Sequence, residues 1–125
     1  MSKTTDEILI RVVHHRDAAD IHAIRSAPQV ARTIANLPYT DIAEVEKRIV
    51  GRSSHMHYLV AEVDGRVVGA VKLWQNTRPR MMHSGSIGLE VHPDYWGRGI
   101  GTKLMEAILD LADNWLDLKR VELEV

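Results

Sequence analysis

Residues 87–105 read Ile-Gly-Leu-Glu-Val-His-Pro-Asp-Tyr-Trp-Gly-Arg-Gly-Ile-Gly-Thr-Lys-Leu-Met. An alternating apolar run ends at a proline turn, three glycines follow at positions 97, 99 and 101, and an amphipathic helical pattern begins at once. A strand that leads through a glycine-rich turn into a helix leaves backbone N–H groups unpaired at the positive end of the helix dipole. Because such a turn attracts phosphate groups, the stretch predicts a site for a phosphorylated cofactor.

The glycine spacing separates several kinds of phosphate-binding loop. A P-loop requires a lysine directly after a glycine, and Lys103 does not follow one. A dinucleotide fingerprint, Gly-x-Gly-x-x-Gly, is one residue longer than the pattern found here. Glu122 and Glu124 do lie about 20 residues downstream, where a ribose-binding acid of that fold would be. However, only one predicted strand follows the motif, which disfavours a doubly wound dinucleotide fold.

The same stretch resembles the acetyl-CoA signature of the GNAT superfamily of N-acetyltransferases, usually written Gln/Arg-x-x-Gly-x-Gly/Ala. Gly99 and Gly101 take the two glycine positions, and Trp96 stands where the family has Gln or Arg. The flanks are similar as well: Leu-Glu-Val-His-Pro-Asp-Tyr-Trp resembles the end of the family's fourth strand, and residues 119–125, Lys-Arg-Val-Glu-Leu-Glu-Val, resemble its fifth. Within the family, the chain is most similar to bacterial amino-acid N-acetyltransferases.

Composition suits a single globular domain over residues 1–125, with 45% hydrophobic and 26% charged residues. A net charge of −1 without a basic stripe disfavours nucleic acid as a partner. The apolar runs are too short for a membrane span, and the first residues lack the apolar core of a signal peptide. The chain has no cysteine, which excludes a cysteine nucleophile and is expected for a cytoplasmic protein.

The hydrophobic patterns predict an α+β domain in the order β-α-α-β-β-β-α-β, and the resemblance implies a GNAT-like mixed sheet with helices on both faces. Asp17 is expected to cap the first helix and Thr40 the second. Asp64-Gly65 between two apolar runs predicts a type I′ hairpin turn, which requires positive φ at both residues. The predicted strands are residues 7–13, 57–63, 66–74, 85–91 and 119–125, and the helices are residues 17–26, a segment after Thr40, and residues 101–118.

The resemblance implies acetyl-CoA as co-substrate, held largely by main-chain groups. The fourth strand would diverge from the fifth near residues 89–91 and bind the pantetheine arm there, while the amides of residues 97–102 would bind the pyrophosphate. Glycine at positions 97, 99 and 101 permits close approach and conformations that a Cβ would penalise. The implied cofactor site is Leu89, Glu90, Val91, Trp96, Gly97, Arg98, Gly99, Ile100, Gly101 and Thr102.

Acetyl transfer to an amine requires a base that removes a proton from the ammonium group. Glu124 is the first candidate because it stands at the Leu-Glu-Val position where some family members carry a catalytic glutamate. Glu90 is the second, and Ser86, near another position that the family uses, would act only through water. For both carboxylates the simpler alternative is a solvent-facing or salt-bridged strand residue.

The seven histidines do not predict a metal site. His14 and His15 are adjacent, so in a strand they point to opposite faces. His55 and His57 can share a face, but no acidic residue or cysteine stands at a recognisable ligand spacing. Surface or loop histidines are the favoured interpretation.

The expected activity is transfer of an acetyl group to a primary amine of a small molecule, with an amino acid favoured. A non-catalytic acyl-CoA-binding module and acetylation of a protein N-terminus remain as alternatives. The printed sequence ends at Val125, within the predicted fifth strand, so the sheet is expected to be incomplete at its C-terminal end. Because an open sheet edge favours pairing, a homodimer or strand-exchanged assembly is expected.

Overall fold

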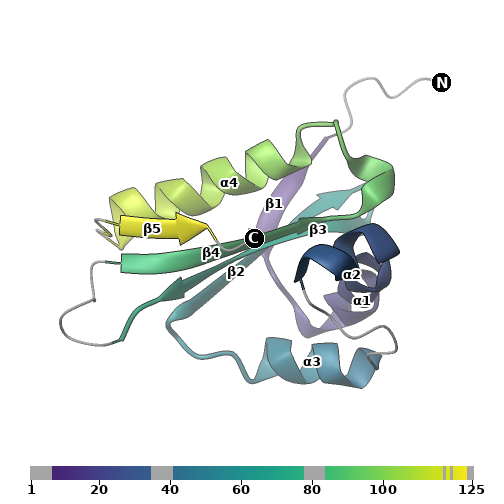
Figure 1. Cartoon of the computed structure of the whole chain (residues 1–125), viewed down its shortest axis with the longest axis horizontal. Helices are drawn as coiled ribbons and strands as arrows, with labels where there is room; N and C mark the ends of the chain where they lie inside the picture. Colours follow the sequence, from purple (N-terminus) through teal and green to yellow (C-terminus); the bar gives the residue numbers. More distant parts are fainter. Residues whose placement is uncertain (1–6, 35–40, 78–83, 117, 119, 124–125) are drawn as a thin grey trace.

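Five strands form one mixed sheet in a computed structural model that describes residues 7–34, 41–77, 84–116, 118 and 120–123. Helix α4 covers one face of the sheet, and α1, α2 and α3 lie on the other (Figure 1). The predicted α+β class with helices on both faces is confirmed. The strands are β1 Leu9–Val12, β2 Met56–Val63, β3 Arg66–Gln75, β4 Ser84–Val91 and β5 Arg120–Leu123, and the helices are α1 Ala18–Ser26, α2 Pro28–Ile34, α3 Ile42–Val50 and α4 Ile100–Asp110.

The strands follow one another in the order β1-β2-β3-β4-β5. The first three pairings are antiparallel, whereas β4 and β5 run parallel from Ser84↔Arg120 to Ile87↔Leu123. Asp64 and Gly65 join β2 to β3 with φ values of 51° and 81°. The hairpin is therefore the predicted one, with positive φ at both turn residues.

Apolar side chains at helical spacing pack against both faces of the sheet. On α4, Leu104 and Ile108 are fully buried and belong to one core cluster, together with alternate residues of β3 and β4. Ile21 and Ile24 of α1 belong to a second cluster on the opposite face. Burial of each such side chain contributes roughly 1.5–3 kcal/mol, so the two clusters hold the helices to the sheet. No helix in the described ranges has the length and apolar character of a membrane span.

Several helix boundaries differ from the sequence-based expectation. The helix predicted over residues 101–118 is α-helical only to Asp110 and continues as a π-helical segment, Leu111–Trp115. An additional short helix, α2, begins at Pro28, two residues after the end of α1. Proline suits a first helical position because the N–H that it lacks has no partner there. The cap of α3 is Asp41, whose side chain accepts a 3.2 Å hydrogen bond from the Ala43 N–H. Thr40, the expected cap, lies outside the described residues.

The Asp17 carboxylate does not cap α1, contrary to expectation. A short 3₁₀ turn at His15–Asp17 precedes the helix, and the buried carboxylate accepts hydrogen bonds from the Arg11 guanidinium at 2.8 and 2.9 Å. The His14 N–H also donates to it, at 2.8 Å. The bidentate pair with Arg11 gives the carboxylate two charge-assisted hydrogen bonds, so Asp17 connects β1 to the start of the helix instead.

This pairing predicts an acid-sensitive contribution to stability. Burial raises the pKa of Asp17, but the hydrogen bonds from Arg11 and the His14 N–H outweigh it and leave that pKa below its usual value. A depressed pKa in the folded state stabilises the fold above the unfolded-state pKa of about 4, and this stabilisation is lost as the pH falls through the folded-state value. We expect Asp17→Asn to destabilise the protein at pH 7 and the difference from wild type to shrink below roughly pH 4.

Urea unfolding of both proteins between pH 3 and pH 7 measures this difference. Asp113→Asn, at an exposed carboxylate, serves as the control and should change little at any pH. A wild-type advantage over Asp17→Asn that stays constant across the range would contradict the prediction.

Candidate functional site

The glycine turn between β4 and α4 adopts backbone conformations that favour glycine. Gly97 has φ of 78°, and Gly99, the N-cap of α4, has φ of 82°. Gly101 differs, because it lies within the helix and a Cβ there would make only ordinary contacts with Leu89 and Val91, at 3.5 and 3.9 Å. Two of the three glycines are therefore required by a left-handed backbone, and the third is not.

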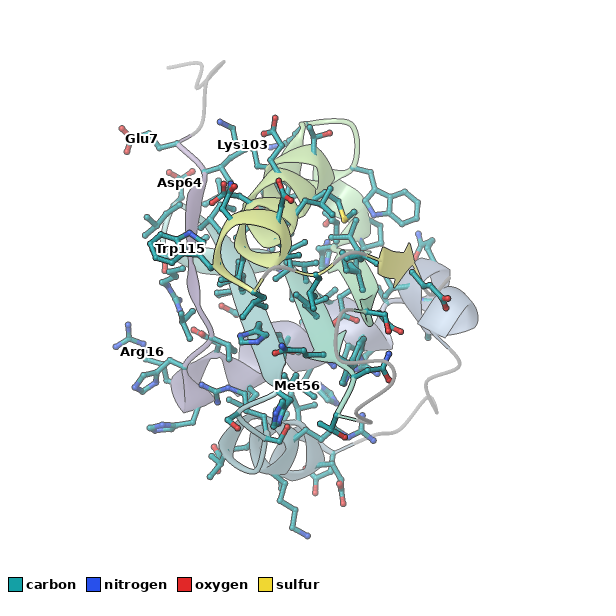
Figure 2. All side chains as sticks on the ribbon, turned by 90° about the vertical axis from the view of Figure 1, so that its left-hand side faces the viewer. Glu7, Arg16, Met56, Asp64, Lys103 and Trp115 are labelled. Carbon is teal, nitrogen blue, oxygen red and sulfur yellow. The ribbon has the colours of Figure 1, made fainter. Side chains whose placement is uncertain are left out.

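The first turn of α4 meets the requirements of an anion site. The Lys103 N–H donates to the carbonyl of the N-cap residue Gly99 at 3.1 Å, so the N–H groups of residues 100–102 have no partner within the helix. The first turn carries no acidic residue, and Lys103 adds a cation at the surface of the same helix (Figure 2). The residues of the turn thus fit a phosphate group.

The C-terminal end of β4 has main-chain groups that no described residue of β5 pairs with, and this side is called the open edge of β4 below. His92 donates its N–H to the Val68 carbonyl on β3 at 2.8 Å. Hydrogen-bonded and non-hydrogen-bonded pairs alternate in an antiparallel ladder, so the main-chain groups of Leu89 and Val91 point away from β3. On that side, β5 pairs with β4 only as far as Ile87 within the described residues. Leu89 and Val91 therefore border the glycine turn with main-chain groups directed to the side where a ligand strand can add.

Trp96, at the position where the signature has Gln or Arg, fastens the turn to this strand. Its indole Nε1 donates a 2.7 Å hydrogen bond to the Val91 carbonyl, although the residue is 54% exposed. The guanidinium of Arg98 lies 4.9 Å from the centre of the Tyr95 ring, which is a cation–π distance. Sequence patterns did not indicate the role of the Trp96 indole, because its acceptor is a main-chain carbonyl.

Glu90 is buried on the face of the sheet that α1 covers. Its exposed fraction is 7%, and its Oε2 forms a 2.9 Å ion pair with Arg25 Nη1 of α1. The other oxygen, Oε1, is buried without a hydrogen-bond partner. Glu90 is therefore a salt-bridged strand residue, which was the simpler alternative to a catalytic role. Its partner Arg25 was not identified from the sequence.

The other predicted catalytic residues have different surroundings. Ser86 is half-buried and lies opposite Trp74 of β3 and Glu122 of β5. Glu124 lies outside the described residues, so the structure does not place it relative to Glu90. No three histidine, aspartate or glutamate side chains gather as metal ligands in the described part of the chain.

Two further polar side chains share the face that carries Glu90. Tyr58 of β2 is buried, and Lys72 lies opposite it on β3. Burial raises the pKa of the Tyr58 hydroxyl, and the charge of Glu90 adds to that effect. Burial lowers the pKa of the Lys72 ammonium below the usual value for lysine. Buried titratable groups with shifted pKa values gather at functional sites more often than elsewhere.

Comparison with known proteins places this site in context. Residues 20–125 match the family described as Acetyltransferase (GNAT) family. The chain is 33% identical over 119 residues to the L-amino acid N-acetyltransferase AaaT of Escherichia coli (strain K12), a match that covers 95% of this chain and 73% of that protein.

Solved structures of similar fold include a GNAT-family acetyltransferase from Streptococcus pneumoniae, with a TM-score of 0.77 and 24% identity over 94% of this chain and 74% of the other. A ribosomal-protein-alanine N-acetyltransferase from Brucella melitensis biovar Abortus 2308 superposes with a TM-score of 0.74 and 23% identity, over 94% of this chain and 80% of the other. At these identities, the two structures show that the fold is shared.

Proposed function

The chain belongs to the acetyltransferase (GNAT) family, and from this premise we propose that it transfers an acetyl group from acetyl-CoA to the primary amine of a small molecule, with an amino acid as the acceptor. The observation that carries the proposal is the glycine turn: two glycines with positive φ lead into the unpaired N–H groups of α4, beside the open edge of β4. The name of the Escherichia coli relative supports an amino-acid acceptor.

The proposed cofactor contacts divide between main-chain and side-chain groups. The N–H groups of residues 97–102 would bind the pyrophosphate, as anions bind at other helix N-termini. The main-chain groups of Leu89 and the N–H of Val91 would pair with the amides of the pantetheine arm, as a neighbouring strand would, whereas the Val91 carbonyl already accepts the Trp96 indole N–H. Trp96 fixes the distance between these two parts, because its indole ties the turn to Val91. Arg98 would add a charge-assisted contact to a phosphate.

Acetyl-CoA supplies an acyl group that is activated as a thioester. The chain's contribution is to hold the acceptor so that its neutral amine nitrogen can form a bond to the acyl carbon while the carbon–sulfur bond breaks. One proton passes from the ammonium to a base before the attack, and a second leaves the nitrogen to solvent as the amide forms, while the departing thiolate takes up a proton from solvent or a nearby acid. We propose Glu124 as that base. Glu90 is the second candidate, although its ion pair with Arg25 favours a structural role.

The direct test is acetyl-CoA-dependent release of free thiol with a panel of L-amino acids, polyamines and N-terminal peptides. Thermal unfolding with acetyl-CoA, and with NAD and ATP as controls, measures cofactor binding separately. A ligand at a hundredfold excess over its Kd stabilises the native state by about 2.7 kcal/mol. Stabilisation by acetyl-CoA together with thiol release on amino acids would support the proposal. Stabilisation without release for any amine would indicate the acyl-CoA-binding module instead.

Removal of the proposed base should lower the rate without affecting cofactor binding. We expect Glu124→Gln to reduce kcat about a hundredfold, because general-base catalysis contributes at least that factor, while the Kd for acetyl-CoA stays within about twofold. Glu122→Gln, at the glutamate two residues earlier in the sequence, is the matched control and should keep most of the activity. Equal rates for Glu124→Gln and wild type would remove Glu124 from the mechanism.

A further inference from the structure

Lys72 lies in the middle of the sheet, and its ammonium group lies near two aromatic rings. It pairs with Tyr58 on β2 and with Gly88 on β4. Its Nζ atom is 5.0 Å from the centre of the Tyr58 ring and 5.8 Å from that of Trp74. Within the described ranges the ammonium forms no hydrogen bond or ion pair. Two aromatic faces therefore hold the charge in place without neutralising it.

The space around this ammonium is bounded by Trp74. A Cβ added to Gly88 would lie 3.2 Å from the Trp74 ring, so the indole lies across Gly88, where β4 presents no side chain of its own. Trp74 is 36% exposed and Lys72 is half-buried. The ammonium is thus partly shielded from water and still reachable from the surface, as a group that binds a small ligand must be.

Charged groups on three neighbouring elements act on Lys72. Burial lowers the pKa of Lys72, the charge of Glu90 on β4 opposes this effect, and Arg25 on α1 and Arg48 on α3 lower the pKa further. Glu90 already forms an ion pair with Arg25. The carboxylate of Glu90 is therefore paired, and the Lys72 ammonium keeps a positive charge for which no described carboxylate is the ion-pair partner. Such a site favours an incoming anion and repels a polyamine.

Lys72 also lies beside β4, the strand that is proposed to bind the pantetheine arm of the cofactor. Gly88, directly opposite Lys72, immediately precedes Leu89, whose main-chain groups border the open edge of β4. Opposite residues of an antiparallel pair have Cα atoms about 4.5–5.5 Å apart. An acceptor bound at Lys72 would therefore be within one side-chain length of the strand that is proposed to bind the pantetheine arm.

We propose that Lys72 binds the carboxylate of an α-amino acid acceptor and thereby selects acceptors that carry an acidic group next to the amine. This inference rests on the proposed function and assigns its specificity to one residue. The Tyr58 and Trp74 rings keep the ammonium directed toward the acceptor. The bound carboxylate provides the ionic partner that Lys72 lacks in the described structure, through charge-assisted hydrogen bonds.

The test compares L-amino acids with their carboxamides, which keep the amine and side chain but lose the negative charge. We expect the wild-type enzyme to have a higher kcat/KM for the amino acid than for its carboxamide. In Lys72→Met, the ratio of these two kcat/KM values should fall at least tenfold, mainly because the KM for the amino acid rises. Methionine keeps an unbranched apolar stem between the two rings. Lys72→Arg should restore part of the ratio, and Lys47→Met, at an exposed lysine of α3, should leave it unchanged.

Each alternative result has a distinct meaning. Equal loss with acid and amide would show that Lys72 only supports the fold and would overturn the inference alone. A wild-type enzyme that releases no thiol with any amine would overturn the proposed function and this inference together. If Lys72→Met fails to fold, an inhibition measurement on the wild-type enzyme tests the inference. The analogue of the acceptor that keeps the carboxylate but lacks the amine should inhibit competitively against the acceptor. Equal inhibition by the amide of that analogue would refute the assignment.

Discussion

Replacing Gly99 with valine is expected to weaken acetyl-CoA binding about a thousandfold, which corresponds to ~4 kcal/mol. Gly99 has φ of 82°, and a Cβ there would point into space that holds no protein atom within 4 Å. In the proposed complex the pyrophosphate would occupy that space. A branched side chain would displace the phosphates from the N–H groups of α4, and each charge-assisted hydrogen bond lost costs about 1.5–3 kcal/mol.

Backbone strain alone would also weaken the variant, so the control must carry the same strain. Gly65 provides it, since its φ is 81° and a Cβ there likewise meets nothing within 4 Å. It belongs to the β2–β3 turn and has no proposed contact with the cofactor. Gly65→Val and Gly99→Val should each lose roughly 1–2 kcal/mol of stability, because both force an L-residue into the left-handed region.

Isothermal titration with acetyl-CoA, and urea unfolding of both variants, measure the two quantities independently. We expect binding near the wild-type value for Gly65→Val and none detectable for Gly99→Val. Tight binding by a folded Gly99→Val would refute the assignment of the loop. Equal weakening in both variants would show that strain, and not the lost phosphate contacts, controls affinity.

The parts of the fold that were predicted correctly depend on local chemistry. The Asp64-Gly65 turn follows from the preference of these two residues for positive φ, and the turn at Gly97 and Gly99 follows from a strand, glycines and an amphipathic helix in direct succession. The buried stripes of α1, α3 and α4 follow from a spacing of three or four residues. Each of these features is determined by neighbours within one or two turns of chain.

The features that were missed depend on residues far apart in sequence or on ambiguous local signals. Arg25 and Glu90 are separated by 65 positions, and no periodicity indicates that α1 brings one above the other. Pro28 suits both the end of one helix and the start of the next, so α2 could not be distinguished from a loop. Asp17 has the chemistry of a helix cap, but Arg11 on β1 competes for the same carboxylate. Lys72 did carry a signal, since it interrupts the apolar run of β3.

The pairing of Arg25 with Glu90 leads to the largest expected effect on stability. The two side chains are 14% and 5% exposed, and they join α1 to β4 through a 2.9 Å contact. Arg25→Leu would leave the Glu90 carboxylate buried without its cation. Removal of one partner from a buried ion pair costs about 3–5 kcal/mol, which is a large part of the 5–15 kcal/mol that stabilises a typical domain.

Urea unfolding of the single and double variants tests this expectation. The double variant Arg25→Leu/Glu90→Leu should recover most of the lost free energy of unfolding, because it no longer contains a buried carboxylate without a cation. Arg48→Leu, at an exposed arginine of α3, is the control for loss of a cation near the same face. A cost below about 1 kcal/mol for Arg25→Leu would show that water reaches Glu90 and that the pair contributes little.

The double variant also decides between the two roles considered for Glu90. It removes one cation and one carboxylate together, so the charge balance around Lys72 is kept while any base at position 90 is lost. If Glu90 only holds α1 against the sheet, a folded double variant should acetylate amino acids at close to the wild-type rate. If Glu90 is the base, the same folded protein should lose about a hundredfold in kcat, although its stability has been restored. Because stability and rate would then change separately, the result assigns Glu90 to the fold or to the chemistry.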